Sequence, residues 1–362
     1  MARRPLPTFL LFSGHNDRAV LALCRYFQGR GLPFVIAAAG PNDAIHRTAY
    51  AGQVVLNRLD RSLSLALFTG LLQRQGGPLV YCPTTEFINH FVLAHRPALA
   101  EAGLDIGLPD AAVYAQLTSK LASQAVVAGL VGLQAPPAQP LAQAHAPCVL
   151  KPRANVQAAQ VLYPRLCLDE ASLAQALAGL NPDDWFAQDY IDGQSHYLCG
   201  YLARDGQRAW YWQDNLLQQP QGKSIVLARS GENPGLDAHR LFDGLHHLGY
   251  HGPFMMELIR DVAGRLHYIE INPRFWGPLQ LALDACPQVL ALFAQDHGAP
   301  AAPTAAPNPP PHWYAWAHGA QLSTCRRYPE AAALGGDANL QALLARFDVY
   351  RGDDSLALHL SH

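Results

Sequence analysis

Apolar residues near the start of the chain fall into short runs separated by an amphipathic stretch. Residues 7–12 (Pro-Thr-Phe-Leu-Leu-Phe) predict a buried strand, and residues 18–29 carry apolar side chains at helical spacing. A second apolar run, residues 34–39, predicts the next strand, and residues 79–82 predict a further one. Because parallel strands are joined by right-handed crossovers of this kind, we expect a parallel α/β domain here.

Strand-like runs dominate the rest of the chain. They occupy residues 148–151, 185–212, 224–229, 254–261 and 265–272. Helices are expected from Thr118 to about Leu130, after Asp169 as N-cap, and over residues 236–248. A parallel α/β start followed by a mixed α+β region indicates separate domains. We therefore divide the chain into domains 1–116 and 117–298 (subdomains 117–186 and 187–298), a stiff proline-rich linker 299–312 and a small C-terminal region 313–362.

Composition narrows the class of protein. Of the 362 residues, 50% are hydrophobic and 15% are charged, and the formal net charge is −2, so no global positive field favours nucleic acid as a partner. The apolar runs fall well short of the roughly 20 residues that span a membrane, so no membrane association is expected and the cytoplasm is the expected compartment. Seven dispersed cysteines without a CxxC pair favour reduced thiols over disulfides or a zinc site.

The most informative pattern covers residues 254–277. Turn residues 261–264 separate two strand-like runs and predict a β-hairpin. If Asp261 pairs with Gly264, alternation puts four polar side chains on one face: Glu257, Tyr268, Glu270 and Asn272. The other face would then carry Phe254, Met256, Leu258, Ile269 and Ile271.

Two carboxylates on one face of a hairpin repel each other unless a cation lies between them. With the amide oxygen of Asn272 they form a hard, all-oxygen ligand set, which suits Mg²⁺ bound to nucleotide phosphates. The alternative is a half-exposed hairpin with charged residues pointing outward. The sequence Asn272-Pro273-Arg274 directly after the second carboxylate favours the metal site.

This segment resembles a known family. Glu270-Ile-Asn-Pro-Arg-Phe-Trp-Gly277, preceded by Gly249-Tyr-His-Gly-Pro-Phe-Met-Met-Glu257, is similar to the metal-binding end of the ATP-grasp superfamily, particularly its carboxylate–amine ligase branch related to carbamoyl-phosphate synthetase. The resemblance implies an N-terminal Rossmann-like pre-ATP-grasp domain and a two-subdomain ATP-grasp fold. It also implies ATP as a cofactor, with Mg²⁺ or Mn²⁺ held by Glu257, Glu270 and Asn272.

The resemblance assigns roles to two upstream lysines. Lys120 resembles the lysine that opens the ATP-grasp region, and Lys151 resembles the lysine that contacts the α- and β-phosphates. The resemblance implies that both lysines bind ATP by holding these phosphates. Either lysine alone would be interpreted as a solvated surface residue; their order ahead of the hairpin favours the functional role. Relatives carry a glycine-rich loop after the second lysine, whereas residues 153–160 contain no glycine. Arg153 is a candidate donor to the phosphates in its place.

The segment Trp185-Phe-Ala-Gln-Asp-Tyr-Ile-Asp-Gly193 resembles the adenine-binding strand and hinge of the family. Backbone groups near Tyr190 and Ile191 would then bond the adenine edge, and Gln188 or Asp189 would add a side-chain contact. His196 is a weaker candidate for the ribose region. The alternative for this stretch is an ordinary strand followed by a turn.

The resemblance implies a reaction as well. A substrate carboxylate would attack the γ-phosphate to give an acyl phosphate, and an amine would displace the phosphate to form an amide or peptide-like bond. Arg274, gripping the γ-phosphate or acyl phosphate, and Lys151 are the catalytic candidates. An ATP-grasp kinase, a thiol ligase and a catalytically weak ATP-binding subunit remain as alternatives, the last favoured by the glycine-free loop.

The expected partners are small molecules, a carboxylate and an amine, which the sequence does not identify. Homodimers are common in the family, although no residue of this sequence indicates one. The loop at residues 13–17 has one glycine where a dinucleotide fingerprint needs three. It is interpreted as a structural turn or a wall of the substrate cleft.

Overall fold

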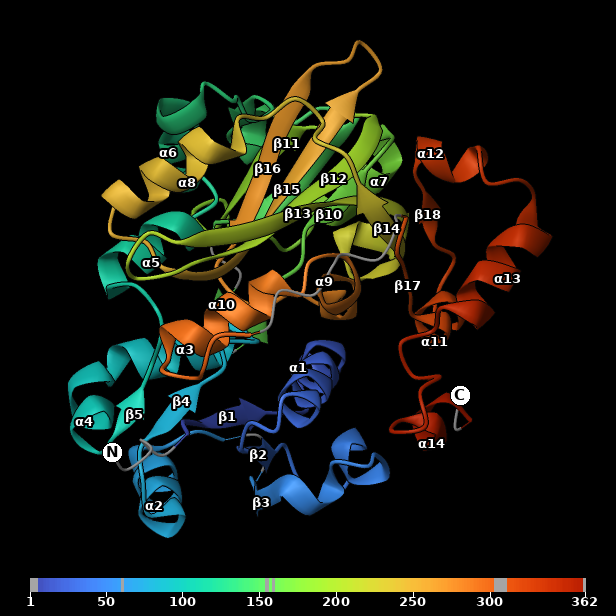
Figure 1. Cartoon of the computed structure of the whole chain (residues 1–362). Helices are drawn as coiled ribbons and strands as arrows, with labels where there is room; N and C mark the ends of the chain where they lie inside the picture. Colours follow the sequence, from blue (N-terminus) through green and yellow to red (C-terminus); the bar gives the residue numbers. More distant parts are fainter. Residues whose placement is uncertain (1–5, 60–61, 154–155, 158–159, 303–310, 361–362) are drawn as a thin grey trace.

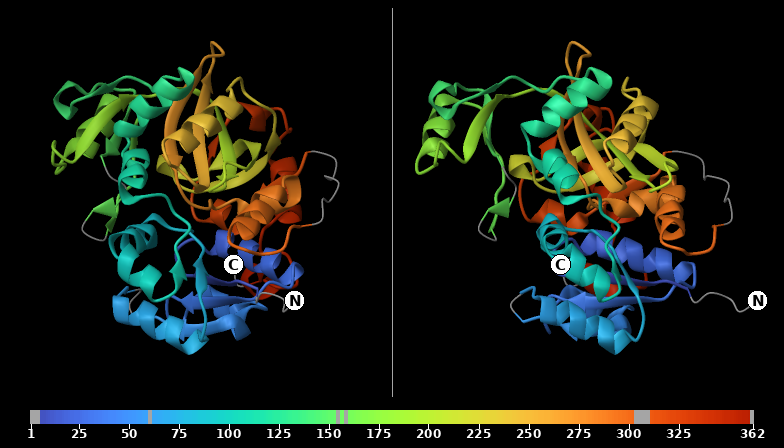
Figure 2. Two further views of the ribbon diagram at one scale, coloured as in Figure 1. Left: turned by 60° about the vertical axis from the view of Figure 1, so that its left-hand side comes forward. Right: turned by 90° about the vertical axis from the view of Figure 1, so that its left-hand side faces the viewer.

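The computed structural model describes residues 6–59, 62–153, 156–157, 160–302 and 311–360. Most of the expected linker 299–312 and part of the glycine-free segment 153–160 lie outside these ranges. Figures 1 and 2 show a parallel sheet at the N-terminal end of the chain, a small sheet that extends to one side, and a large antiparallel sheet. No helix within the described ranges has the length and apolar character needed to cross a bilayer.

The N-terminal sheet is parallel throughout, as its β-α-β pattern predicted. Its strand order is β3-β2-β1-β4-β5, so the order reverses between β1 and β4. The strands are β1 (Thr8–Phe12), β2 (Phe34–Ala38), β3 (Val54–Asn57), β4 (Leu79–Tyr81) and β5 (Leu104–Asp105). The helices are α1 (Asp17–Gly29), α2 (Leu65–Gln75), α3 (Glu86–Ala94) and α4 (Arg96–Glu101).

Two helices lead out of this domain, α5 (Ala111–Thr118) and α6 (Ala122–Val131). The helix expected from Thr118 to about Leu130 is therefore present as α6, but it begins four residues later, at Ala122, because α5 ends at Thr118. Ser119 between them is extended, with φ −69° and ψ 117°. Apolar periodicity continues through both helices, so it could not show the break in which Lys120 lies.

The small sheet has the order β10-β7-β11-β6, and its pairs are antiparallel. Its strands are β6 (Ala138–Gln139), β7 (Cys148–Pro152), β10 (Arg165–Cys167) and β11 (Trp185–Asp189), with a hairpin of β8 (Val156–Gln157) and β9 (Gln160–Val161). Asp169 caps α7 (Glu170–Leu177) in a capping box with Ser172, which confirms the expected N-cap. We call residues 138–189 the lid subdomain.

The large sheet has the order β16-β15-β12-β13-β14-β17, and β18 pairs with β13. Its strands are β12 (Gly193–Leu202), β13 (Arg208–Gln218), β14 (Ile225–Gly231), β15 (Gly252–Asp261), β16 (Leu266–Asn272), β17 (Trp313–Ala315) and β18 (Arg326–Arg327). The C-terminal region thus contributes two strands to this sheet. The remaining helices are α8 (Ala238–His247), α9 (Leu279–Ala285), α10 (Gln288–Asp296), α11 (Ala317–Gln321), α12 (Pro329–Ala332), α13 (Asp337–Arg346) and α14 (Leu356–His359).

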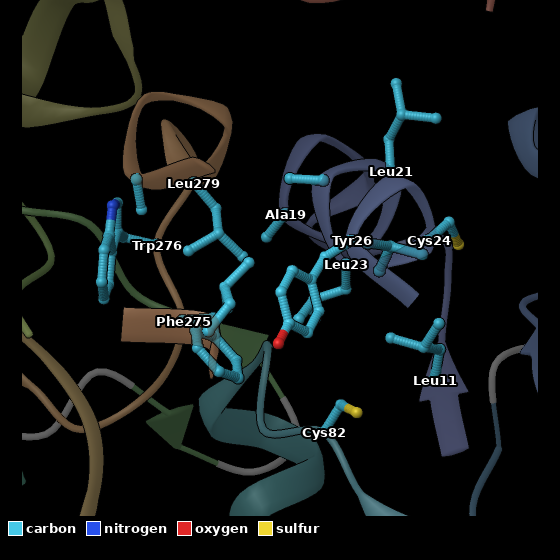
Figure 3. Close-up of a cluster of buried hydrophobic side chains, with 14 of the residues drawn as sticks. Leu11, Ala19, Leu21, Leu23, Cys24, Tyr26, Cys82, Phe275, Trp276 and Leu279 are labelled. Carbon is cyan, nitrogen blue, oxygen red and sulfur yellow. The ribbon is translucent and has the colours of Figure 1, made fainter. Parts of the chain in front are cut away.

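One continuous core joins the N-terminal domain to the large sheet. Figure 3 shows side chains of α1, among them Ala19 and Leu23, gathered beside Phe275, Trp276 and Leu279, which follow β16 in the chain. The backbone N–H of Phe275 also donates to the carbonyl of Pro83 at 2.8 Å. Burial of large aromatic rings at this junction fixes the residues after β16 against the N-terminal sheet.

Candidate active site

The expected metal ligands lie on the hairpin of β15 and β16. Near the turn Leu258 pairs with Tyr268, but a bulge follows, and Glu257 pairs directly with Glu270. Ile269 is the additional residue of that bulge. Glu257 and Glu270 are therefore direct cross-strand neighbours on one face of the hairpin. Simple alternation without a bulge places Tyr268 opposite Glu257, with Glu270 two positions further along the strand.

The bulge corrects two assignments made from strand alternation. Tyr268 was expected beside the carboxylates, but it is fully buried on the opposite face, where its hydroxyl lies 2.9 Å from Ser123 Oγ. Ile269 was expected on that opposite face, but it lines the same cleft as Glu257 and Glu270. An inserted residue reverses the alternation beyond it, and a hydrophobic pattern does not show where the insertion falls.

Two buried lysines accompany the glutamates. Lys120 Nζ donates to Glu270 Oε2 at 2.6 Å, and Asn272 Nδ2 donates to Glu270 Oε1 at 2.8 Å. Lys151, at the end of β7, is 5% exposed and faces the same carboxylates from the lid subdomain. The tertiary fold thus brings together residues from the α5–α6 connection, the lid subdomain and the hairpin.

The environment separates the pKa values of the two glutamates. Burial and the charge of Glu270 raise the pKa of Glu257 to about 7. Burial also disfavours the charge of Glu270, but the nearby ammonium of Lys120 outweighs it and lowers the pKa of Glu270 to about 2. Burial and the like charge of Lys120 lower the pKa of Lys151 to about 8. Near neutral pH the two lysines and two glutamates together carry a net positive charge, which favours the binding of a polyanion.

The same residues fit a divalent cation. Glu257 keeps a proton up to about pH 7 because it lies away from water and its carboxylate faces a second carboxylate. A hard cation bound between the two would displace that proton and use both carboxylates, with the amide oxygen of Asn272 next to them. The donor chemistry of this set therefore suits Mg²⁺ or Mn²⁺.

A cleft of about 700 Å³, part of it open to solvent, extends from the carboxylates to the lid subdomain. Seven of the residues selected from the sequence line it: Lys151, Gln188, Asp189, Tyr190, Ile191, Glu257 and Glu270. Apolar side chains of Val149, Ile259 and Ile269 face the same space. A cleft with apolar walls at one end and charged groups at the other can hold a planar base joined to phosphates.

The hinge between the lid subdomain and the large sheet is held by specific hydrogen bonds. The side-chain amide of Gln188 donates to the carbonyl of Pro136 at 2.8 Å, and the N–H of Asp189 donates to the carbonyl of Pro137 at 3.0 Å. The Gln188 amide group therefore fixes the hinge to the chain just before β6. Tyr190 and Ile191 follow directly and form the wall of the cleft.

His196 does not lie where the sequence interpretation put it. Tyr197 pairs with Glu257 and shares its face, so the adjacent His196 points to the opposite face of the sheet. There its Nδ1 lies 2.8 Å from Asp214 Oδ1, and the side chain is buried. Strand alternation thus excludes His196 from the ribose region. Arg153 is exposed in the lid subdomain and is not among the described residues that line the cleft.

Arg274 lies where the hairpin meets the N-terminal domain. It is half-buried, with Nη1 donating to the carbonyl of Phe275 at 3.1 Å and Nη2 lying 3.5 Å from Asn272 Oδ1. Asn16, which follows β1, donates to the carbonyls of Thr84 at 3.1 Å and Phe275 at 3.4 Å. The loop of Arg274 therefore faces the carboxyl ends of β1 and β4. The strand order of the sheet reverses between these two strands, and open α/β sheets form a crevice at such a position.

Sequence reasoning missed several residues that line the cleft. Arg326 and Tyr328 come from the C-terminal region, Gln218 from the end of β13, and Gln221 from the turn before β14. No local periodicity marks these positions, because each reaches the cleft only through long-range packing. The basic and aromatic run Arg326-Arg327-Tyr328 was the one available signal, and by itself it does not indicate a site.

No protein-family model matches the sequence, and the comparison with curated proteins finds no relative. Solved structures do match. One is the biotin carboxylase domain of Hydrogenobacter thermophilus 2-oxoglutarate carboxylase, solved as a dimer in complex with MgADP, ADP and bicarbonate. It has a TM-score of 0.62 at 15% identity, and the match covers 83% of this chain and 71% of that one. Campylobacter jejuni biotin carboxylase has a TM-score of 0.61 at 14% identity, over 82% and 72%.

A synthetase is also similar in structure. N5-carboxyaminoimidazole ribonucleotide synthetase from Thermus thermophilus has a TM-score of 0.57 at 20% identity, over 82% of this chain and 80% of that one. Identities this low support a shared fold, whereas function depends on the individual site. The chain therefore shares its fold with these enzymes, which agrees with the fold that the resemblance of its sequence to the ATP-grasp superfamily implied.

Proposed function

We propose that this chain is an ATP- and Mg²⁺-dependent ligase that joins a carboxylate to an amine through an acyl phosphate. The observation that carries the proposal is the direct pairing of Glu257 with Glu270 at one end of a cleft whose other end is the hinge. The structural neighbours support it, because the Hydrogenobacter domain was solved with MgADP and bicarbonate. The parallel N-terminal sheet would then serve as the Rossmann-like pre-ATP-grasp domain.

Each group would act by position and charge. Adenine would lie against Tyr190 and Ile191, and Lys151 would hold the α- and β-phosphates. Glu257, Glu270 and Asn272 would hold Mg²⁺, which when bound neutralises charge on the phosphates. Lys120 would keep Glu270 ionised and ready to act as a ligand.

The reacting groups would meet beside Arg274. The substrate carboxylate would attack the γ-phosphorus, the bond to the β-phosphate oxygen would break, and ADP would leave. The amine would then attack the acyl carbon, form the amide bond and release phosphate. Arg274 would bind the transferred phosphoryl group through its planar fork, next to the crevice at the ends of β1 and β4.

The reaction class can be tested by ADP release. The protein is incubated with ATP, Mg²⁺ and pooled carboxylates, amino acids and amines, and the products are identified by mass spectrometry. Bicarbonate is included because the Hydrogenobacter domain was solved with it. An amide product is expected. A stable phosphorylated product would indicate a kinase, a thioester would indicate a thiol ligase, and nucleotide binding without hydrolysis would indicate an ATP-binding subunit.

The metal site is tested by Glu270→Ala. This change is expected to abolish ATP turnover while the folded structure is retained, because it removes one of the two opposed carboxylates. Glu232→Ala is the matched control, since Glu232 is exposed after β14 and away from the cleft. Near wild-type turnover in Glu270→Ala, measured with saturating Mg²⁺, would rule out the assignment.

A further inference from the structure

The C-terminal region supplies one wall of the cleft. β18 pairs with the end of β13, where Arg326 is the partner of Gln218 and Arg327 the partner of Leu217. Arg326, Tyr328 and Gln218 all line the cleft that contains the paired glutamates. Figure 1 shows β18 at the edge of the large sheet, leading into α12. A part of the chain without a predicted role therefore reaches the proposed nucleotide site.

Arg326 lies against two aromatic rings in this wall. Its Cζ is 4.8 Å from the ring centroid of Tyr328 and 5.3 Å from that of Tyr190. Its Nη2 also donates to the Tyr190 hydroxyl at 2.9 Å. Rings at these distances hold a guanidinium group by cation–π attraction and restrict its orientation. Because Tyr190 belongs to the hinge, Arg326 connects the C-terminal region to the part of the cleft expected to bind adenine.

The charge of Arg326 is poorly compensated within the described part of the chain. Its acidic partner there is Asp192, at 3.8 Å, and the side chain of Asp192 is 74% exposed. A long ion pair with a solvated carboxylate contributes little, whereas the side chain of Arg326 is only 27% exposed. A largely buried cation next to a cleft, with such a weak partner, is suited to bind a further anion.

Arg326 lines the same cleft as the paired carboxylates of Glu257 and Glu270. That cleft extends from the hinge, which Arg326 contacts at Tyr190, to these carboxylates. A nucleotide with its base at the hinge and its terminal phosphates at the carboxylates must place its ribose and first phosphates along this stretch.

The segment that carries Arg326 is firmly attached to the large sheet. The N–H of Tyr328 donates to the carbonyl of Leu216 at 3.0 Å, and its hydroxyl bonds the side chain of Gln218. At the start of α12, Glu330 accepts a hydrogen bond from Arg229 at 2.8 Å, and its own N–H donates to Gln194 Oε1 at 3.0 Å. Such attachment fixes Arg326 before a ligand arrives, which reduces the entropy lost on binding.

We propose that Arg326 is a nucleotide-binding residue whose guanidinium contacts the phosphates of the bound nucleotide that lie nearest its ribose. The C-terminal region then completes the nucleotide site, and Tyr328 and Tyr190 hold the guanidinium in place. This inference rests on the proposed function, because it requires that a nucleotide occupies the cleft.

The test compares ligands with and without phosphates. Dissociation constants for MgADP and for adenosine are measured by calorimetry on the full chain and on Arg326→Gln, Arg326→Lys and Arg327→Gln. Loss of a hydrogen-bonded charge should weaken MgADP binding by roughly tenfold in Arg326→Gln. Adenosine binding should change by less than about threefold. Arg326→Lys should recover part of the loss, because lysine keeps the charge without the planar fork.

Arg327→Gln is the matched control. Arg327 is the neighbouring arginine on the same short strand, but it is exposed and pairs with Asp337 at 2.6 Å outside the cleft, so its loss should leave both constants unchanged. Equal weakening of adenosine and MgADP in Arg326→Gln would show that Arg326 only supports the hinge, and unchanged binding would remove it from the site. Either result overturns this inference alone. Failure of the unchanged protein to bind MgADP would contradict the proposed function, and the inference with it.

Discussion

The two opposed glutamates should respond in opposite directions when each is made neutral. Glu257→Gln is expected to stabilise the metal-free protein above neutral pH, whereas Glu270→Gln is expected to destabilise it. The reason lies in their surroundings. Glu257 is half-buried opposite another carboxylate, while Glu270 accepts hydrogen bonds from Lys120 at 2.6 Å and from Asn272 at 2.8 Å.

The magnitude follows from the pKa values. The folded protein raises the pKa of Glu257 from an ordinary 4.5 to about 7, so it binds that proton more tightly than the unfolded chain does. The stability due to this proton is complete below pH 4.5 and is lost as the pH rises through 7. At about 1.4 kcal/mol for each pKa unit, the loss is about 3 kcal/mol or less, since part of the side chain reaches solvent.

Glu270 has the opposite sign. Its pKa falls from 4.5 to about 2, so its stabilising effect is present above pH 4.5 and is lost as the pH falls through 2. At about 1.4 kcal/mol for each pKa unit, Glu270→Gln should lower the free energy of unfolding at neutral pH by about 3 kcal/mol. The change also leaves the buried ammonium of Lys120 without its partner.

Urea unfolding in EDTA at about pH 5 and about pH 8 measures both effects. The free energy of unfolding of Glu257→Gln, relative to the unchanged protein, should increase between the two pH values by up to about 3 kcal/mol. Added Mg²⁺ should then stabilise the unchanged protein more than either variant, because binding to the folded state alone adds stability. Destabilisation of Glu257→Gln at about pH 8 in EDTA, similar to that of Glu270→Gln, would refute the reasoning.

Two further predictions concern the lysine pair and the lid subdomain. Lys120→Met should lower the free energy of unfolding near neutral pH by about 3 kcal/mol, because it breaks a buried ion pair. Lys223→Met is the control, since it removes a cation that lies 5.3 Å from the Tyr163 ring centroid. An equal effect of both changes in urea unfolding would contradict the prediction. Gln221 has a φ of 62° and its side chain accepts a hydrogen bond from the N–H of Leu166 in β10, so Gln221→Gly should relieve backbone strain of about 1 kcal/mol but loosen the lid subdomain. Hydrogen exchange should become faster at Leu166, and unchanged protection there would show that this contact does not hold the lid subdomain.

Whether the sequence predicted a structural feature depended mainly on how close together in the chain the residues that form it lie. The β-α-β start, the N-cap at Asp169 and the hairpin before Asn272 were predicted because each depends on residues close together in the chain. The bulge at Ile269 was not predicted, although it also lies within the hairpin. A bulge changes which side chain meets the core on the far side of the sheet, and that core includes side chains of α6 and α8, which lie outside the hairpin.

By itself, the sequence determined the chemical content of the site: two carboxylates, an amide, two lysines and a hinge, in an order that resembles one superfamily. The tertiary structure decided how these groups pair. It set Lys120 against Glu270 and raised the pKa of Glu257, and it turned His196 to the other face of the sheet. It also brought Arg326 to the cleft from 136 positions beyond Tyr190. Periodicity and spacing describe neighbours along the chain, whereas burial, charge and contact depend on which distant segments pack together.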